Sequence, residues 1–236
     1  MSITVYSCVS YAPTFGVVRT QDHWTALHFV NAIKNRPLAG YAFLPLPSGE
    51  AVQIDRLSVE SAPGWFAELA VQALSWRDVL PCGLVPVPDA ECSLAANRPP
   101  RTNRLAEALA SALGPDAAAV DLLRWARPML PTHLAEDSRD PQVLYGRLRV
   151  RDRLQLVRDQ RFVLVDDVMA SGAHMRAVAA FLRDCGATIV CAICAARAHD
   201  RLSENGSFLS SSVHELSDFH SDPGWDLAEV YEGVEL

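Results

Sequence analysis

The chain has 236 residues, of which 50% are apolar and 21% are charged, and this composition excludes a disordered or fibrous protein. A chain of this length needs no disulfide or metal staple, so it forms one elaborated domain or a small domain with an extension. The net charge of −7 predicts no general attraction to nucleic acid or anionic lipid, so any anion site must be local.

The first 75 residues carry weak signals for structure. Hydrophobic patterning there predicts one helix, Asp22–Asn35. It also predicts three extended segments, Ile3–Tyr6, Tyr41–Leu46 and Ala51–Leu57. The apolar residues between Trp65 and Trp76 recur at helical spacing, which predicts a second helix with one buried face.

The middle of the chain is punctuated by proline and glycine. A strand is predicted at Gly83–Val87, ending at the Pro88-Asp89 turn. A half-buried helix is predicted at Asn103–Leu113, followed by Gly114. Residues 126–147 contain three prolines and a glycine, and we expect a long irregular loop there.

A strand, a helix and a second strand follow. Phe162–Val165 and Thr188–Ala195 are unbroken apolar runs, and the helix between them, Ala173–Asp184, ends near Gly186. Apolar rather than alternating strands indicate a parallel sheet that is covered on both faces. The predicted fold class is α/β, a parallel twisted sheet flanked by helices.

The six cysteines suggest thiols in a reducing compartment rather than a disulfide framework. The first charged residue is Arg19, so the N-terminus lacks the basic start of a secretory signal, and no apolar run reaches about 18 residues. We therefore expect a cytoplasmic protein without a membrane partner.

The most informative segment runs from Phe162 to His174. Its strand delivers two adjacent carboxylates, Asp166 and Asp167, to the end where open α/β sheets bind ligands. The small residues from Ala170 to Gly172 then let backbone amides turn inward at a helix start, which makes an anion receptor. A receptor for hydroxyls beside one for an anion suits a sugar phosphate. An ordinary strand-to-helix turn with a capping Asp is the alternative.

This segment resembles the signature of type I phosphoribosyltransferases, in which an apolar strand runs into two acidic residues and a Thr/Ser-Gly phosphate loop. The resemblance implies that Asp166 and Asp167 are catalytic residues that contact the ribose hydroxyls of 5-phosphoribosyl 1-diphosphate (PRPP). It also implies a loop that cradles the 5-phosphate, made of Met169, Ala170, Ser171, Gly172, Ala173 and His174.

Three other segments are similar to the ComF-like branch of that superfamily. Ala26–Arg36 resembles its early helix ending in a lysine, and Leu84–Pro88 resembles its Val-Pro-Val-Pro strand and turn. Arg98–Ala110 resembles its arginine-rich turn and helix. The resemblance implies a single phosphoribosyltransferase-like domain over residues 1–236. Its core spans about 76–200, preceded by an N-terminal hood or extension over 1–75 and followed by a tail over 201–236.

The chain also departs from the family pattern. Ala170 and Ser171 stand where two hydroxyl residues are usual, and His174 stands where a threonine is usual. His174 either donates to the phosphate or points to solvent. The N-terminal four-cysteine zinc module of the branch is absent, and the run at 100–103 is altered to Pro-Arg-Thr-Asn. These changes preserve a binding site but weaken the expectation of turnover.

The resemblance implies transfer of the phosphoribosyl group to a nitrogen nucleophile through an oxocarbenium-like transition state, with Mg²⁺ on the diphosphate. Because Mg²⁺ retains waters and substrate oxygens, no metal ligand from the protein side chains is predicted. The candidate diphosphate-binding residues are Pro88, Asp89, Arg98 and Arg101. A loop that closes over the site is expected to use Arg127, His133 and Arg139, and a disordered connection is the alternative.

Three further patterns are interpreted as structural. Cys191 and Cys194 lie three apart in a predicted strand, so they face opposite sides and are expected to be buried thiols. Trp65 and Trp76 are expected in the core or in a subunit contact. The tail is expected to be solvated and acidic rather than a metal site, although it carries His214, Glu215, Asp218, His220 and Asp222.

Two functions stay open. The first is a transferase that joins a phosphoribosyl group to a nucleobase or similar compound. The second is a non-catalytic regulatory protein of ComF type that binds PRPP or a nucleotide and serves DNA uptake or nucleic-acid handling. The expected partners are PRPP, Mg²⁺ and a nucleobase-like molecule. A homodimer stays open, and the net charge of −7 argues against nucleic acid without closing that option.

Overall fold

A computed structural model describes residues 2–13, 20–96, 98–129, 140–151, 157–199 and 209–219. Six strands form the main sheet of this part of the chain, in the order β10-β1-β9-β8-β4-β5. They are β1 Ser2–Tyr11, β4 Cys82–Pro86, β5 Ala117–Ala119, β8 Arg161–Met169, β9 Thr188–Ala198 and β10 Ser212–Ser217. Neighbouring strands are parallel except β10, which pairs antiparallel with β1 at the sheet edge. The predicted α/β class is confirmed.

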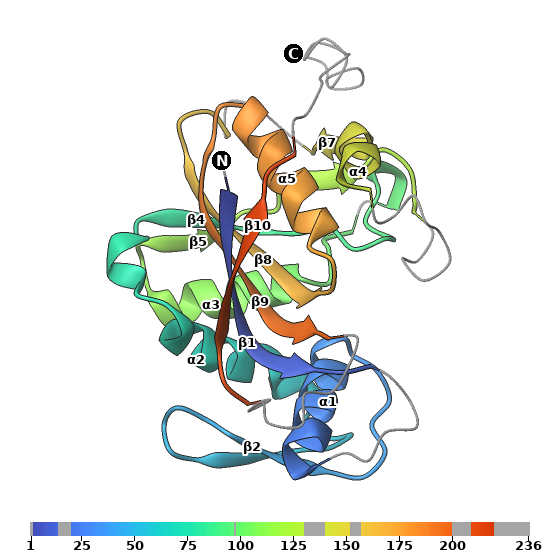
Figure 1. Ribbon diagram of the computed structural model, residues 1–236, viewed down its shortest axis with the longest axis vertical. Coiled ribbons are helices and arrows are strands. Elements are labelled where there is room, and N and C mark those ends of the chain that lie inside the picture. The colour runs from blue at the N-terminus through green and yellow to red at the C-terminus, as the bar shows by residue number, and fades with distance from the viewer. Residues whose placement is uncertain are drawn as a thin grey trace.

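Helices cover both faces of the sheet (Figure 1). One face carries α1 Gln21–Ile33, α2 Ala62–Ala73 and α3 Asn103–Leu113, and the other carries α4 Pro141–Arg147 and α5 Ala173–Asp184. The smaller elements include two antiparallel strand pairs, β2 Ala42–Pro45 with β3 Ala51–Ile54 and β6 Leu123–Trp125 with β7 Leu148–Val150. The described residues also form three 3₁₀ turns, η1 Val59–Ser61, η2 Trp76–Asp78 and η3 Leu94–Ala96.

The apolar run of β8 explains its central place. Phe162 and Leu164 belong to the core under α5, whereas Val163 and Val165 belong to the core under α1, α2 and α3. Because both faces of β8 are buried, its residues are apolar at consecutive positions, and they do not alternate with polar residues as in a strand with one solvated face. Gly83 in β4 lets the neighbouring strand pack closely, since a Cβ atom there would lie 2.7 Å from the Phe162 ring.

The two sides of the sheet also separate two of the cysteines. Cys191 packs in the core under α1–α3 and Cys194 in the core under α5, which confirms that they face opposite ways. All six cysteines are buried thiols. Trp65 and Trp76 pack into the core, where they are 9% and 7% exposed. No helix in the described ranges has the length and apolar character needed to cross a bilayer.

Helices α3 and α5 have the predicted bounds, and β1, β8 and β9 are longer than predicted. The predicted irregular loop over 126–147 is wrong at its end, because α4 occupies Pro141–Arg147. There Pro141 follows the N-cap Asp140, whose side chain accepts from the amide of Gln142 at 2.9 Å. Proline in the first turn starts a helix instead of breaking it.

The predicted tail contains a strand that sequence patterns missed, because Ser212–Ser217 form β10. This strand pairs with Ser2–Ser7 of β1 and alternates between half-buried and exposed residues. An edge strand with one solvated face needs few apolar residues, so its polar sequence concealed it. The sheet thus takes strands from outside the predicted 76–200 core. The single domain over 1–236 stays a prediction.

Candidate functional site

The acidic pair lies at the carboxyl end of β8, where the neighbouring parallel strands β4, β9 and β1 also end. Asp167 is only 6% exposed, and its backbone amide donates to Asp166 Oδ1 at 2.8 Å. Burial, and next the charge of Asp167, raise the pKa of Asp166 to about 7. Around neutral pH the pair therefore carries less than two full negative charges.

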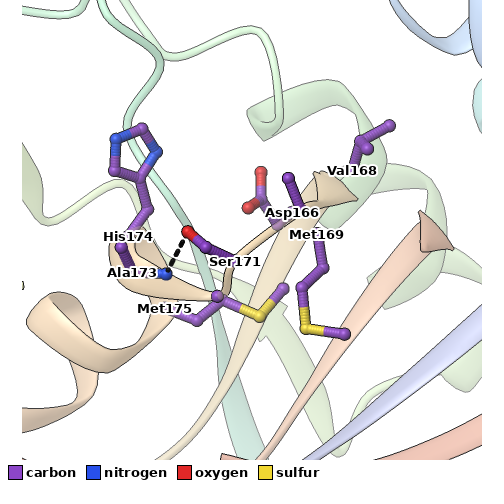
Figure 2. A pocket seen from close by; sticks show the side chains of 9 residues that line it. Asp166, Val168, Met169, Ser171, Ala173, His174 and Met175 are labelled. Carbon is purple, nitrogen blue, oxygen red and sulfur yellow. Dashed lines mark hydrogen bonds between the residues drawn. The ribbon is translucent and has the colours of Figure 1, made fainter. Parts of the chain in front are cut away.

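The end of β8, the loop after it and the start of α5 form a small, solvent-open pocket of about 80 Å³. The pocket is lined by Asp166, Val168, Met169, Ala170, Ser171, Gly172, Ala173, His174 and Met175. Figure 2 shows the hydroxyl of Ser171 turned toward the amide of Ala173, from which it accepts at 3.4 Å. Gly172 has φ of 76° and is the N-cap of α5, so the loop leads directly into the helix start. A helix start with a small-residue loop before it attracts an anion.

Two cations from other parts of the chain face Asp167. Arg101 Nη2 lies 2.5 Å and Nε 3.2 Å from Asp167 Oδ2. Lys34 Nζ lies 3.9 Å from Asp167 Oδ1. Burial alone would lower the pKa of Arg101, but Asp167, Asp89 and Asp166 together more than offset this effect, so the pKa of Arg101 is raised. The acidic pair is thus partly neutralised by the segments that surround it.

The turn after β4 is organised by Asp89. Its carboxylate accepts from the amides of Glu91 at 3.1 Å and Arg101 at 2.7 Å, and from Arg98 Nη2 at 3.3 Å. Arg98 also pairs with Glu91 at 2.6 Å. Pro88 is buried and has no N–H to donate. Of the four candidate diphosphate residues, Arg101 alone faces the acidic pair, while Asp89 and Arg98 stabilise the turn beside it.

His174 lies on the far side of the loop from Asp166 (Figure 2). Its ring centroid is 5.6 Å from that of Trp125. Burial lowers the pKa of His174 although Asp167 opposes the shift, so the imidazole is neutral at neutral pH. Its Nε2 is buried and has no hydrogen-bond partner among the described residues. The ring is thus half-buried against Trp125, in the lining of the pocket.

The expected covering loop starts and ends beside this site. Strands β6 and β7 pair Trp125 with Leu148, and the amide of Ala126 donates to the carbonyl of Arg147 at 2.8 Å. Trp125 Nε1 donates to the Asp89 carbonyl at 2.9 Å, which links this strand pair to the turn after β4. Arg127 is exposed. His133 and Arg139 lie outside the described residues.

Lys34 and Arg104 lie in segments that resemble the family, but sequence patterns assigned neither of them a role in the site, to which the fold brings both. Arg104, at the start of α3, donates through Nη2 to the carbonyls of Ala32 at 3.3 Å and Ile33 at 2.6 Å. These carbonyls belong to the last turn of α1, which has no basic residue of its own. One available signal was that Lys34 is the only lysine among 21 basic residues.

Comparison with known proteins agrees with this geometry. A family model described as phosphoribosyl transferase domain matches residues 104–227, just over half of the chain. The matched region contains β8, the acidic pair, the loop and α5. No curated protein matches the chain.

Proposed function

Since the chain belongs to the phosphoribosyl transferase domain family, we propose that it binds PRPP and transfers the phosphoribosyl group to a nucleobase or a similar nitrogen nucleophile. The observation that carries this proposal is the acidic pair at the end of β8, placed directly before the Ala170–Gly172 loop and the start of α5. That arrangement offers acceptors for the ribose hydroxyls and donors for the 5-phosphate at one edge of the sheet.

In the proposed complex, Asp166 and Asp167 accept hydrogen bonds from the ribose diol and the loop amides bind the 5-phosphate. Arg101 lies where a diphosphate leaving group can meet a guanidinium fork. The C1–O bond to diphosphate breaks with its electron pair on oxygen, a C1–N bond forms, and the nucleophile loses a proton. The protein then contributes orientation and charge stabilisation rather than a covalent nucleophile.

The residues present fit Mg²⁺ only as an ion held mainly by the ligand. In the ranges that the structure describes, no group of three or more His, Cys, Asp or Glu side chains forms a metal cage. Asp89 and Asp167 are already paired with Arg98 and Arg101. Mg²⁺ prefers oxygen ligands and keeps several waters, so diphosphate oxygens would be its main ligands. It would neutralise charge on the leaving group.

A regulatory protein of ComF type that binds PRPP without turnover is the second candidate. One observation favours it: Ser171, the hydroxyl residue of the loop, turns its oxygen to the amide of Ala173, and its neighbour Ala170 offers no hydroxyl. With fewer side-chain donors, the loop would bind the 5-phosphate more weakly. The buried thiols support the cytoplasm as the place of action under either function. A homodimer stays a prediction.

Calorimetry with PRPP and Mg²⁺, followed by a diphosphate-release assay over a panel of nucleobases, tests the proposal. We expect PRPP to bind with a micromolar Kd, about −8 kcal/mol, and at least one base to release diphosphate. Binding without release on any base would favour the regulatory function. Absence of binding to PRPP and to every ribonucleotide 5-phosphate would contradict both.

Gly172→Ala is expected to weaken the affinity for ribose 5-phosphate about tenfold. At φ of 76° a side chain costs about 1–2 kcal/mol. In addition, the new Cβ would lie 2.5 Å from a Leu216 methyl group of β10, so the loop or Leu216 must shift. Calorimetry with ribose 5-phosphate measures the effect.

Gly114→Ala is the matched control. Gly114, after α3, has φ of 85°, but a Cβ there meets nothing within 4 Å. Its ψ of −158° differs from the 7° of Gly172, and a side chain is strained in both conformations. The Gly114 substitution should therefore lower thermal stability and leave ligand affinity unchanged. Equal ligand affinities in the Gly172 and Gly114 variants would show that the loop does not hold the phosphate.

A further inference from the structure

Lys34 faces the acidic pair from a part of the chain that the phosphate loop does not include. It is the C-cap residue of α1, and its side chain is 18% exposed. The 3.9 Å between Nζ and Asp167 Oδ1 is longer than a hydrogen bond, so charge alone links the two groups. The charge of Lys34 also lowers the pKa of Asp166, although burial and the charge of Asp167 outweigh this effect.

The end of α1 is held at this position by α3. Arg104 donates to the last carbonyls of α1, and Thr102, just before α3, donates through Oγ1 to the Val87 carbonyl at 2.7 Å. These contacts tie the ends of α1 and β4 to one segment, which also carries Arg101. The backbone of Lys34, at the end of α1, is therefore fixed beside the site by hydrogen bonds, of which the Thr102 bond is buried and the Arg104 bond part-buried.

Three cations act electrostatically on the acidic pair, namely Lys34, Arg101 and Arg104. Asp89 also acts on Arg101, and Glu60 also acts on Arg104, so each arginine has a further carboxylate partner. Among the described residues, the ion pair of Lys34 is with Asp167. Once another group occupies Asp167, an additional anionic group of a ligand would balance the charge of Lys34.

Lys34 and Arg101 differ in how firmly Asp167 holds them. Arg101 is fixed by two nitrogens on Asp167 and by its amide on Asp89. Lys34 makes the longer contact and ends a flexible four-carbon stem, so it can leave the carboxylate without breaking a hydrogen bond. Lys34 is the cation that a ligand can redirect most easily.

We propose that Lys34 is a diphosphate-binding residue: once ribose hydroxyls occupy Asp167, its ammonium turns to the diphosphate. This inference rests on the proposed function. As the C1–O bond breaks and the electron pair stays on the diphosphate oxygen, Lys34 stabilises the added charge while keeping its own proton. A residue from the N-terminal region thereby completes a site whose other parts come from β8, α5 and α3.

The test compares two ligands on the full chain. PRPP with Mg²⁺ carries the diphosphate, whereas ribose 5-phosphate shares the sugar and the 5-phosphate but lacks it. Lys34→Met should weaken PRPP binding about tenfold or more and change ribose 5-phosphate binding less than about twofold. Lys34→Arg should retain most of the PRPP affinity, since it keeps the charge. Melting curves identify any variant that fails to fold, and Lys34→Gln then replaces it.

Arg77→Met is the matched control, because Arg77 is an exposed cation in η2, before β4 and at the opposite edge of the sheet. It should leave both affinities unchanged. If PRPP binds normally to the Lys34→Met protein, or if both ligands weaken equally, Lys34 does not contact the diphosphate. If the unsubstituted protein fails to bind PRPP, the proposed function fails and the inference falls with it.

Discussion

Asp167→Asn is expected to reduce PRPP affinity by roughly 10- to 100-fold. In the proposed complex this carboxylate accepts hydrogen bonds from the ribose diol, and hydrogen bonds to a charged group contribute about 1.5–3 kcal/mol each. The amide keeps the shape of the side chain but loses its charge. The ion pairs of Asp167 with Arg101 and Lys34, 2.5 Å and 3.9 Å long, are lost as well, but this frees both cations for the diphosphate and so does not add to the expected loss. Calorimetry with PRPP and Mg²⁺ measures the loss.

The matched control for this prediction is Asp78→Asn. Asp78 is an exposed carboxylate of η2, next to the amino end of β4 and so at the edge of the sheet away from the site. Its substitution removes the same charge from the chain and should leave PRPP affinity as it was. Should Asp167→Asn bind PRPP as tightly as the Asp78 variant does, the acidic pair would not be the ribose receptor.

The elements of the site differ in how far the sequence predicts them. The bounds of α5 follow from helical spacing and Gly186, and β8 follows from an apolar run that only a doubly covered strand tolerates. Strand β10 was missed because an edge strand can be polar, and α4 because proline in a first helical turn resembles a loop signal. These errors arise where one local pattern has two structural meanings.

The long-range contacts of the site are the part that no local pattern predicts. The acidic pair and the loop are contiguous in the sequence, so one segment is enough to predict what they can bind. Lys34, Arg101 and Asp167 come from α1, the turn before α3 and β8, and only the topology brings them together. Likewise, the packing of Leu216 against Gly172 depends on β10 crossing to the sheet edge beside β1. Residue type indicates what each side chain can bind, and the fold decides which of them meet.

The ligand-free protein should become less stable as the pH rises from about 4 to about 7, relative to an Asp166→Asn variant. Burial raises the pKa of Asp166 from 3.8 in the unfolded chain to about 7 in the folded protein. In this window the folded state keeps a proton that the unfolded state has lost. The free energy of unfolding therefore falls with increasing pH until Asp166 is ionised in both states.

Unfolding of both proteins by heat or denaturant at pH 5 and pH 8 measures this effect, because titrations common to both cancel in the comparison. The Asp166→Asn variant should gain a few degrees in Tm relative to the unsubstituted protein at pH 8, and less at pH 5. Saturating PRPP should reduce the Tm difference between the two proteins at pH 8. Ribose hydroxyls that donate to the ionised carboxylate of Asp166 stabilise this charged form, which burial disfavours in the ligand-free folded protein. A pH-independent difference between the two proteins would mean that Asp166 is already ionised in the folded state. In that case the ligand would not be needed to stabilise its charge.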